Sequence, residues 1–390
     1  MTLKIQSINT QKLRRAFTVA FTQEAFILLI YMAISASVLN IFMQTRSLKE
    51  SSEEFGFSKM LDGSAIRPNV YRQLVPIIAN QVARLVPPQE QQSFESNYLN
   101  RYHLKEMYFG KARERLEWGF KLYEEWSPEY AIKYHAVYIL IFFTLVATLY
   151  SLRALIPTVS SNYNPLTPFV PVLFVLLMPM FFMHGNFSYD FLELLFLSLL
   201  MLSAKKGNYA WWLILFPLAV LNKETNILAL LLYSPIIIGN CFRWRSRLFL
   251  SISFTISLSI YFFIKHKYSQ NIGDSFSWYP EDKIVFLLDP KSYFLWWDLY
   301  APMIPFPRGF NIILLLILAK LLFWQWHDKP VFIKRLLIIA AVVNFPLFML
   351  FCQKDEIRNL SFMFMPMYLL AVHTLLSPEM ELDKLKQIKP

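Results

Sequence analysis

Residues 209–238 read "YAWWLILFPLAVLNKETNILALLLYSPIII", in which two apolar runs flank the polar residues 222–226. The run before this polar turn has about 13 apolar residues, or ~20 Å of helix, whereas the hydrocarbon core of a bilayer is about 30 Å thick. A helix here is therefore expected to be short, broken or re-entrant. Lys223 and Glu224 lie in the turn, and ionisable groups at membrane depth are costly and usually paired. They form either a local ion pair at an interfacial turn or part of a functional site, which we favour.

The rest of the chain also consists of long apolar blocks. Of its 390 residues, 56% are hydrophobic and 17% are charged, and the mean hydropathy is +0.38. A soluble domain typically has about 25% charged residues. Blocks such as 25–43, 168–183, 248–264 and 336–352 approach the length of helix that crosses a bilayer. The sequence therefore predicts an all-α fold, a polytopic transmembrane helical bundle.

We expect about ten spans in one transmembrane domain that covers residues 1–390, with edges uncertain by a few residues. They lie near 20–43, 133–152, 168–184, 189–204, 210–222, 225–241, 248–265, 309–326, 335–352 and 359–376. Basic residues fall before the first span, in every second connection and in the C-terminal tail. Because cytoplasmic loops carry an excess of lysine and arginine, this pattern predicts that both termini are cytoplasmic. The same rule explains the net charge of +11 without nucleic acid.

Two outer segments are long. The first, 44–132, contains apolar residues at helical spacing over 67–86 and charge pairs over 104–126, so both stretches are expected to be helices that lie on the membrane surface. The second, 266–308, is rich in aromatic residues and interrupted by prolines, which predicts a loop with short helices. Its Trp278 offers a flat face for a sugar ring, although aromatic residues also populate membrane interfaces generally.

Three more polar clusters are expected on the same outer side as the 222–226 turn. His184 ends one span, and Asp190 begins the next at a helix N-terminus, which itself favours an acid. The other two clusters, within 50–72 and 353–359, follow the first span and precede the last, and each could be an ordinary solvated loop. Their shared side and depth favour one site. The candidate residues of these two loops are Glu54, Asp62, Arg67, Tyr71, Arg72 and Arg358.

Carboxylates and arginines at the outer boundary suit the transfer of a sugar from a lipid phosphate. Cationic groups would hold the phosphate, on which charge develops as it leaves. A carboxylate would take the proton of the acceptor hydroxyl. The histidines show no spacing typical of a metal site, and the two cysteines cannot form a disulfide framework. An acidic first loop could hold a divalent cation such as Mg²⁺ or Mn²⁺, but the sequence resolves no ligand set.

Three stretches resemble the GT-C superfamily of integral-membrane glycosyltransferases. "FGFSKMLDGSAIRPNVYRQLVPIIA" (55–79) looks like the first-loop pattern of that family, and "SYDFLELLFLSLLML" (188–202) and "FPLAVLNKETNILALLLY" (216–233) look like its central spans. The resemblance implies a polyprenyl-phosphate-linked sugar donor, a glycan, lipid or protein acceptor, and a place in the bacterial inner (plasma) membrane, in cell-envelope polysaccharide biosynthesis.

The resemblance also implies roles for individual residues. The family's catalytic carboxylate is typically an aspartate in the first loop, often within an acidic pair. Here the pair is Glu53-Glu54, and the nearby aspartate is Asp62, so the base stays unassigned. The expected catalytic residues are Glu54, Asp62 and Asp190, and the expected substrate-binding residues are Arg67, Tyr71, Arg72, His184, Lys223, Glu224, Arg358 and Trp278.

Two other classes of function stay open. A flippase or polymerase of lipid-linked oligosaccharides would need charges at mid-membrane, and outside 210–241 the spans carry very few. A non-catalytic scaffold of an envelope-assembly complex would use the 88–132 segment to dock a protein partner.

Overall fold

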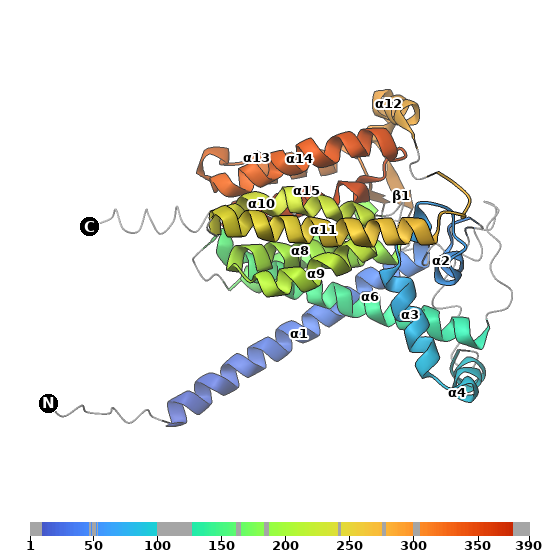
Figure 1. The fold of residues 1–390 in the computed structure, drawn as a ribbon. Helices are drawn as coiled ribbons and strands as arrows, with labels where there is room; N and C mark the ends of the chain where they lie inside the picture. Colours follow the sequence, from blue (N-terminus) through green and yellow to red (C-terminus); the bar gives the residue numbers. More distant parts are fainter. Residues whose placement is uncertain are drawn as a thin grey trace, which may run out of the picture.

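In a computed structural model, the protein is described over residues 10–46, 48, 52, 54–99, 127–160, 165–182, 187–240, 243–274, 278–298 and 305–376. These residues form a helical bundle with one small two-stranded sheet (Figure 1). The predicted all-α helical bundle is thus confirmed.

A helix occupies each of the ten segments expected to be spans. These helices are α1 (Thr10–Arg46), α6 (Pro128–Leu155), α7 (Val170–Phe182), α8 (Ser188–Lys206), α9 (Tyr209–Asn222), α10 (Ala229–Asn240), α11 (Arg243–Lys267), α13 (Ile312–Phe323), α14 (Val331–Phe351) and α15 (Ser361–Leu376). Five stretches are long and apolar enough to cross a membrane, namely Phe21–Met43, Pro128–Thr158, Trp244–Lys267, Val331–Phe351 and Ile357–Leu376. These stretches indicate that the protein is a membrane protein.

The short elements cluster in the two outer segments and at helix junctions. They are α2 (Phe57–Asp62), η1 (Asn69–Tyr71), α3 (Leu74–Leu85), α4 (Pro88–Ser93), η2 (Phe94–Leu99), η4 (Ile156–Thr158), η5 (Thr167–Phe169), η6 (Glu224–Leu228), α12 (Pro280–Leu288), η7 (Pro290–Tyr293), β1 (Trp296–Asp298), β2 (Pro305–Pro307), η8 (Trp326–Asp328) and η9 (Ile357–Leu360). In Figure 1, α2, α3, α4, α12 and β1 lie at the right of the view, at one end of the bundle, which we call the loop end.

The stretch expected to be one surface helix over 67–86 differs in its first part. Residues 67–73 form turns and the short η1, and the helix α3 begins only at Leu74. Pro68 and Pro76 explain this start, because proline is tolerated in turns and in a helix's first turn but not in its interior. The stretch 104–126 and much of the 88–132 docking segment lie outside the described residues. The turns at 67–73 are the part of this stretch that faces the site described below.

Helix α8 forms the centre of the bundle. It packs against α6, α9, α10 and α15, and its apolar residues Leu197, Leu200 and Met201 are completely buried. Ser198 of α8 also shares a hydrogen bond of 2.6 Å with Ser151 of α6. Because α8 is enclosed along its length, polar residues in its first turn are held rigidly and away from bulk solvent.

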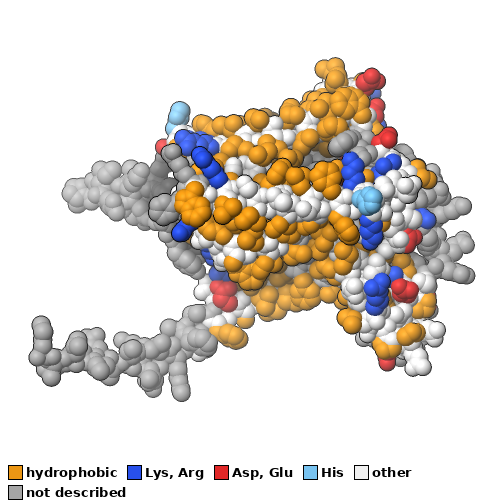
Figure 2. All heavy atoms as spheres, viewed as in Figure 1, with side chains coloured by type: hydrophobic (Ala, Val, Ile, Leu, Met, Phe, Trp, Pro, Cys, Tyr) orange, Lys and Arg blue, Asp and Glu red, His pale blue; other side chains and the backbone are white. Residues whose placement is uncertain are grey.

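The outer surface of the bundle is apolar along its sides. Large side chains such as Phe263 on α11 and Val342 on α14 are 70% and 68% exposed. Figure 2 shows such side chains covering the visible side of the bundle, with basic side chains gathered toward its two ends. Soluble monomers rarely expose apolar patches of this extent. The surface is that expected of helices that contact lipid.

The end opposite the loop end is held together by ion pairs and buried lysine contacts. Arg153 of α6 binds Glu24 of α1 through two N–H···O bonds of 2.6 and 2.8 Å. Lys329, which precedes α14, is buried and donates to the carbonyl oxygen of Leu370 at 2.7 Å. These contacts tie α13, α14 and α15 together far from the polar residues of the loop end.

Candidate functional site

The site begins at a break in the polypeptide between α9 and η6. Lys223 has an extended backbone (φ −156°, ψ 123°), so the helix that ends at Asn222 does not continue into η6. Buried amides satisfy the backbone around the break: Asn222 Nδ2 donates to the Tyr189 carbonyl and Asn226 Nδ2 to the Ala219 carbonyl, each at 2.8 Å. The prediction of a broken helix at this turn is confirmed.

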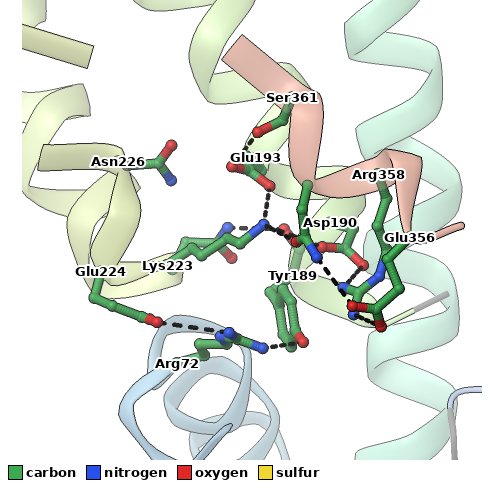
Figure 3. Close-up of polar contacts among 12 residues, drawn as sticks. Arg72, Tyr189, Asp190, Glu193, Lys223, Glu224, Asn226, Glu356, Arg358 and Ser361 are labelled. Carbon is green, nitrogen blue, oxygen red and sulfur yellow. Dashed lines mark hydrogen bonds and ion pairs between the residues drawn. The ribbon is translucent and has the colours of Figure 1, made fainter. Parts of the chain in front are cut away.

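Because of the break, the side chains of Lys223 and Glu224 point in different directions. Figure 3 shows Lys223 pointing toward Glu193 and Asp190 of α8, whereas Glu224 points toward Arg72 of the first outer segment. The Lys223–Glu224 local ion pair that we considered is therefore not what the structure shows. Each side chain has a partner from a distant part of the sequence.

Lys223 belongs to a buried ionic network at the start of α8 (Figure 3). Its Nζ lies 2.7 Å from Glu193 Oε2 and 3.6 Å from Asp190 Oδ1. Arg358 lies on the other side of Asp190, with Nη1 at 2.8 Å from Asp190 Oδ2. The Asp190 and Glu193 side chains are only 1% exposed. The two acids therefore neutralise two cations that would otherwise be too costly to bury.

Further polar groups fix the remaining atoms of this network. Ser361 donates to Glu193 Oε1 at 2.7 Å. Arg358 Nη2 lies 3.2 Å from Glu356 Oε1, and the Gln353 N–H donates to Glu356 Oε2 at 3.2 Å. Burial alone would raise the pKa of the Glu356 carboxyl, but Arg358 and the Gln353 N–H outweigh burial and lower it. Glu356 is therefore an ionised structural partner of Arg358.

A second ionic group, from the first outer segment, lies beside the network. Arg72 Nη2 is 3.5 Å from Glu224 Oε1, and Nη1 donates to the Tyr189 hydroxyl. The Arg72 guanidinium also lies over the Tyr189 ring, 4.3 Å from its centroid. Burial opposes its charge, but Tyr189 and Glu224 raise the pKa of Arg72 above its ordinary value. Arg72 is thus a fixed cation at the loop end.

These groups line a cavity of about 660 Å³. Its walls come from the first outer segment, the polar turn after α9, the end of α14 and the loop before α15. The residues that line it are Glu54, Phe55, Ile66, Arg67, Pro68, Asn69, Tyr71, Arg72, Phe187, Lys223, Glu224, Thr225, Tyr261, Tyr279, Asn344, Leu347, Phe348, Phe351, Cys352, Gln353, Lys354, Asp355, Glu356, Arg358, Asn359, Ser361 and Phe362. Stretches that are far apart in the sequence thus form one pocket.

Most of the residues proposed from the sequence meet in this pocket. Those that line it are Glu54, Arg67, Tyr71, Arg72, Lys223, Glu224 and Arg358. Asp190 lies beneath the pocket wall, and its carboxylate is held by Arg358 and Lys223. His184 lies outside the described residues. Six charged residues and Tyr71, from distant stretches of the sequence, therefore line one pocket.

Asp62 and Trp278 are placed differently from the others. Asp62 is exposed and does not line the pocket, and its Oδ1 accepts hydrogen bonds from the N–H and hydroxyl of Ser64 at 2.8 and 2.6 Å. It therefore stabilises the turn after α2. Trp278 is 63% exposed and packs edge-on against Phe351, whose ring lines the pocket, so it lies next to the pocket rather than inside it.

Sequence reasoning missed several residues of the site. Tyr189 directly precedes the charged Asp190 and gives no signal of its own. Ser361 is a residue type common in membrane helices, and Asn344 lies within an apolar block. Asn344 Nδ2 donates to the Asn359 carbonyl at 2.7 Å, and its Oδ1 accepts from the Phe362 N–H at 3.2 Å. A single amide within an otherwise apolar helix was the signal that could have revealed it, because buried amides need such partners.

Several residues that line the pocket have a buried polar atom that lacks a hydrogen-bond partner within the described part of the chain. The donors are Arg67 Nε, Tyr71 Oη, Arg72 Nε and Arg358 Nε, and the acceptor is Glu224 Oε2. Buried polar groups are normally satisfied, so these residues are candidates for contacts with a polar ligand. Three guanidinium N–H groups suit an anion. No group of three or more His, Cys, Asp or Glu residues that could hold a metal ion occurs among the described residues.

Comparisons of the chain with known protein families, with curated proteins and with solved structures found no match.

Proposed function

We propose that this protein is a membrane glycosyltransferase of GT-C type, which moves a sugar from a polyprenyl-phosphate donor to an acceptor outside the cytoplasm. The observation that carries the proposal is the pocket at the loop end. It combines the buried cations Arg72 and Arg358, each with an N–H group that has no partner in the described residues, with a carboxylate oxygen of Glu224.

This combination suits the departure of a phosphate. In the proposed reaction the bond between the sugar and the phosphate oxygen breaks, and negative charge grows on the phosphate. Fixed N–H donors in a site shielded from water stabilise such charge strongly. Arg67, Arg72 and Arg358 would hold the phosphate, while Glu224 keeps Arg72 in place and Asp190 and Glu356 keep Arg358 in place.

The surroundings of the pocket suit a lipid substrate. An apolar cavity of about 350 Å³ lies between α3, α9 and α11 and is lined by residues such as Ile77, Leu221 and Phe263. The hydrogen bond between Tyr268 and Gln73, of 2.8 Å, lies at its edge, and Gln73 directly follows Arg72. A donor could thus place its phosphate near Arg72 and its polyprenyl chain along this cavity.

The same proposal includes the orientation of the bundle. All ten long helices would cross the membrane, with both termini in the cytoplasm and the loop end outside. The five stretches that are long and apolar enough to span support membrane crossing by α1, α6, α11, α14 and α15. The shorter ones, such as α9 and α13, would cross within the bundle, where broken helices are tolerated because protein satisfies the backbone.

The experiment uses the purified full chain in proteoliposomes with polyprenyl phosphates that carry tritiated hexoses or arabinose. We expect tritiated sugar to move to a membrane-extract acceptor or to water, with release of polyprenyl phosphate. Replacing Arg72 or Arg358 by Met should lower the rate at least 100-fold, as loss of a group that stabilises transition-state charge does. Arg84→Met is the matched control, because Arg84 is exposed on α3 and does not line the pocket.

Two results would contradict the proposal. If labelled lipid crossed the bilayer with its sugar bond intact, the protein would be a flippase. If the donor were neither bound nor cleaved, while the chain co-purified with a stoichiometric protein partner, the scaffold function would take its place.

A further inference from the structure

We propose that Glu224 is the general base of this site. The inference rests on the proposed transferase function and assigns a role that the sequence left open between first-loop acids. It starts from the carboxylates that reach the pocket, which are Glu54, Glu224, Asp355 and Glu356. A base needs an oxygen that faces the substrate and is not occupied by another group.

The network acids do not meet this condition. Both oxygens of Glu356 are engaged, one by Arg358 and the other by the Gln353 N–H and the Asn359 amide. Glu193 binds Ser361 through one oxygen and Lys223 through the other, and Asp190 lies between Lys223 and Arg358. These carboxylates hold the cations of the pocket. Asp190 Oδ1 also lacks a hydrogen bond within the described residues, but it lies 3.6 Å from Lys223 Nζ, and neither Asp190 nor Glu193 lines the pocket.

The other pocket acids are placed less well than Glu224. Glu54 is exposed to solvent at the mouth of the pocket. Asp355 packs against the Gly309 turn, where a Cβ on residue 309 would come within 3.2 Å of its Oδ2. That close approach fixes Asp355 as part of the wall between the pocket and the start of α13.

Glu224 has one anchored oxygen and one oxygen without a partner in the described residues. Its side chain is 18% exposed, Oε1 lies 3.5 Å from Arg72 Nη2, and Oε2 is buried. A buried carboxylate oxygen without a hydrogen bond costs free energy, so the site is suited to an O–H donor that binds there. The hydroxyl group of an acceptor is such a donor.

The break between α9 and η6 explains why this carboxylate is available. The extended backbone of Lys223 directs the lysine into the network, where Glu193 and Asp190 neutralise it. Glu224 is thereby left without its sequence neighbour as an ion-pair partner and faces the pocket.

The proposed transfer reaction needs only the donor, the acceptor and side chains of the pocket. The acceptor oxygen forms a bond to the anomeric carbon of the sugar, and the bond between that carbon and the phosphate oxygen breaks. The electron pair of the broken bond leaves with the phosphate, which Arg67, Arg72 and Arg358 stabilise. The acceptor proton passes to Glu224 Oε2. With water as acceptor the same step is hydrolysis of the donor, which gives an assay that needs no known acceptor.

The test measures hydrolysis of tritiated polyprenyl-phosphate hexoses by the full chain in proteoliposomes, together with the Kd of the donor. We expect Glu224→Gln to lower kcat about 100- to 10,000-fold, the usual contribution of a general base, while the donor Kd changes less than about threefold. Formate should partly restore Glu224→Ala, because a small carboxylate can occupy the vacated space.

The control variant is Glu90→Gln, on the exposed face of α4 and outside the pocket. It should leave kcat unchanged. If Glu224→Gln kept the wild-type kcat, or if it weakened donor binding and left kcat alone, Glu224 would not be the base. If Glu54→Gln lowered kcat while Glu224→Gln did not, the role would belong to Glu54. If the wild type cleaved no donor of the panel, the proposed function itself would fail.

Discussion

The most unusual residue of the molecule is Lys223, an ammonium group buried at the inner wall of the pocket. Taking a single charge out of water costs several kcal/mol, and its partners offset this cost only when geometry is good. Glu193 at 2.7 Å and Asp190 at 3.6 Å provide that geometry. With Arg358 and Glu356 included, the cluster holds two cations and three acids, so both cations are neutralised without a ligand.

This pairing of charges predicts the effect of replacing Lys223 on stability. Lys223→Met leaves Glu193 and Asp190 short of a cation, and breaking such a buried pair costs about 3–5 kcal/mol. We expect a marked drop in the thermal unfolding temperature in detergent. The double variant Lys223→Met/Glu193→Gln should recover most of the loss, because neither partner is then left charged and unpaired. Equal instability of the single and double variants would show that the pair does not act as a unit.

Individual residues also show what the sequence could and could not predict. The polar turn was recognisable because Lys223 and Glu224 interrupt an apolar run. Their partners were not, since Arg358 and Asp190 are 168 positions apart in the chain and only folding brings them to 2.8 Å. Charge pattern alone could not separate Glu54, which lines the pocket, from Asp62, which caps a turn. That difference depends on the direction of the chain around α2.

Among the elements, α12 connects the second outer segment to the pocket. Its Lys283 is fully buried, lies over the Phe348 ring at 3.6 Å, and donates to the Gln353 carbonyl at 3.1 Å and to the Lys354 carbonyl. Gln353, Lys354 and Phe348 all line the pocket. The helix therefore fixes the loop that carries Glu356 and Arg358, using a lysine for which sequence analysis had no role.

The burial of Lys283 predicts how the docking of α12 depends on pH. Burial lowers the pKa of Lys283 from 10.5 to about 8. Between these values the unfolded segment binds more protons than the folded one, so the free energy of local unfolding rises with pH. The free-energy cost of burying the charged ammonium group of Lys283 is fully present below pH 8 and is gone by pH 10.5. At 1.36 kcal/mol for each pKa unit, this cost is at most about 3 kcal/mol.

Hydrogen exchange of the peptide that contains α12, corrected for the intrinsic effect of pH, measures this change. Protection should increase across the window in the wild type and stay flat in Lys283→Met. A wild-type protection that is constant, or that falls as pH rises, would mean that the ammonium form is the one stabilised in the folded protein.

The elements themselves were largely predictable. Helices occupy all ten segments expected to be spans because long apolar runs leave little choice of structure in a bilayer. The first outer segment was harder: the sequence predicted one surface helix from residue 67, but turns occupy 67–73, and these turns bring Arg67, Tyr71 and Arg72 to the pocket. A helix there would have placed Arg67 and Tyr71 one turn apart on one face, with Arg72 about 100° around the axis from Tyr71.

At the scale of the whole molecule, the two ends of the bundle differ in character. The loop end holds the pocket, while the opposite end holds the Arg153–Glu24 pair and the buried Lys329. Arg247, near the start of α11, is exposed. From there α11 runs to Lys267, next to the wall of the pocket that the first outer segment forms, where Tyr268 binds Gln73. A chain inserted according to its basic residues places Arg247 in the cytoplasm and the pocket outside.

Labelling with a membrane-impermeant maleimide in intact cells tests this orientation. In a background with Cys241 and Cys352 replaced by Ser, Glu281→Cys on the exposed part of α12 should react at once if the loop end faces outward, as proposed. Arg247→Cys should react only after the membrane is permeabilised. The two positions are matched in being exposed ends of helices, so a difference between them reports the side of the membrane. Immediate reaction at 247 with protection at 281 would place the pocket in the cytosol, where a donor presented at the outer leaflet could not reach Arg72 and Glu224.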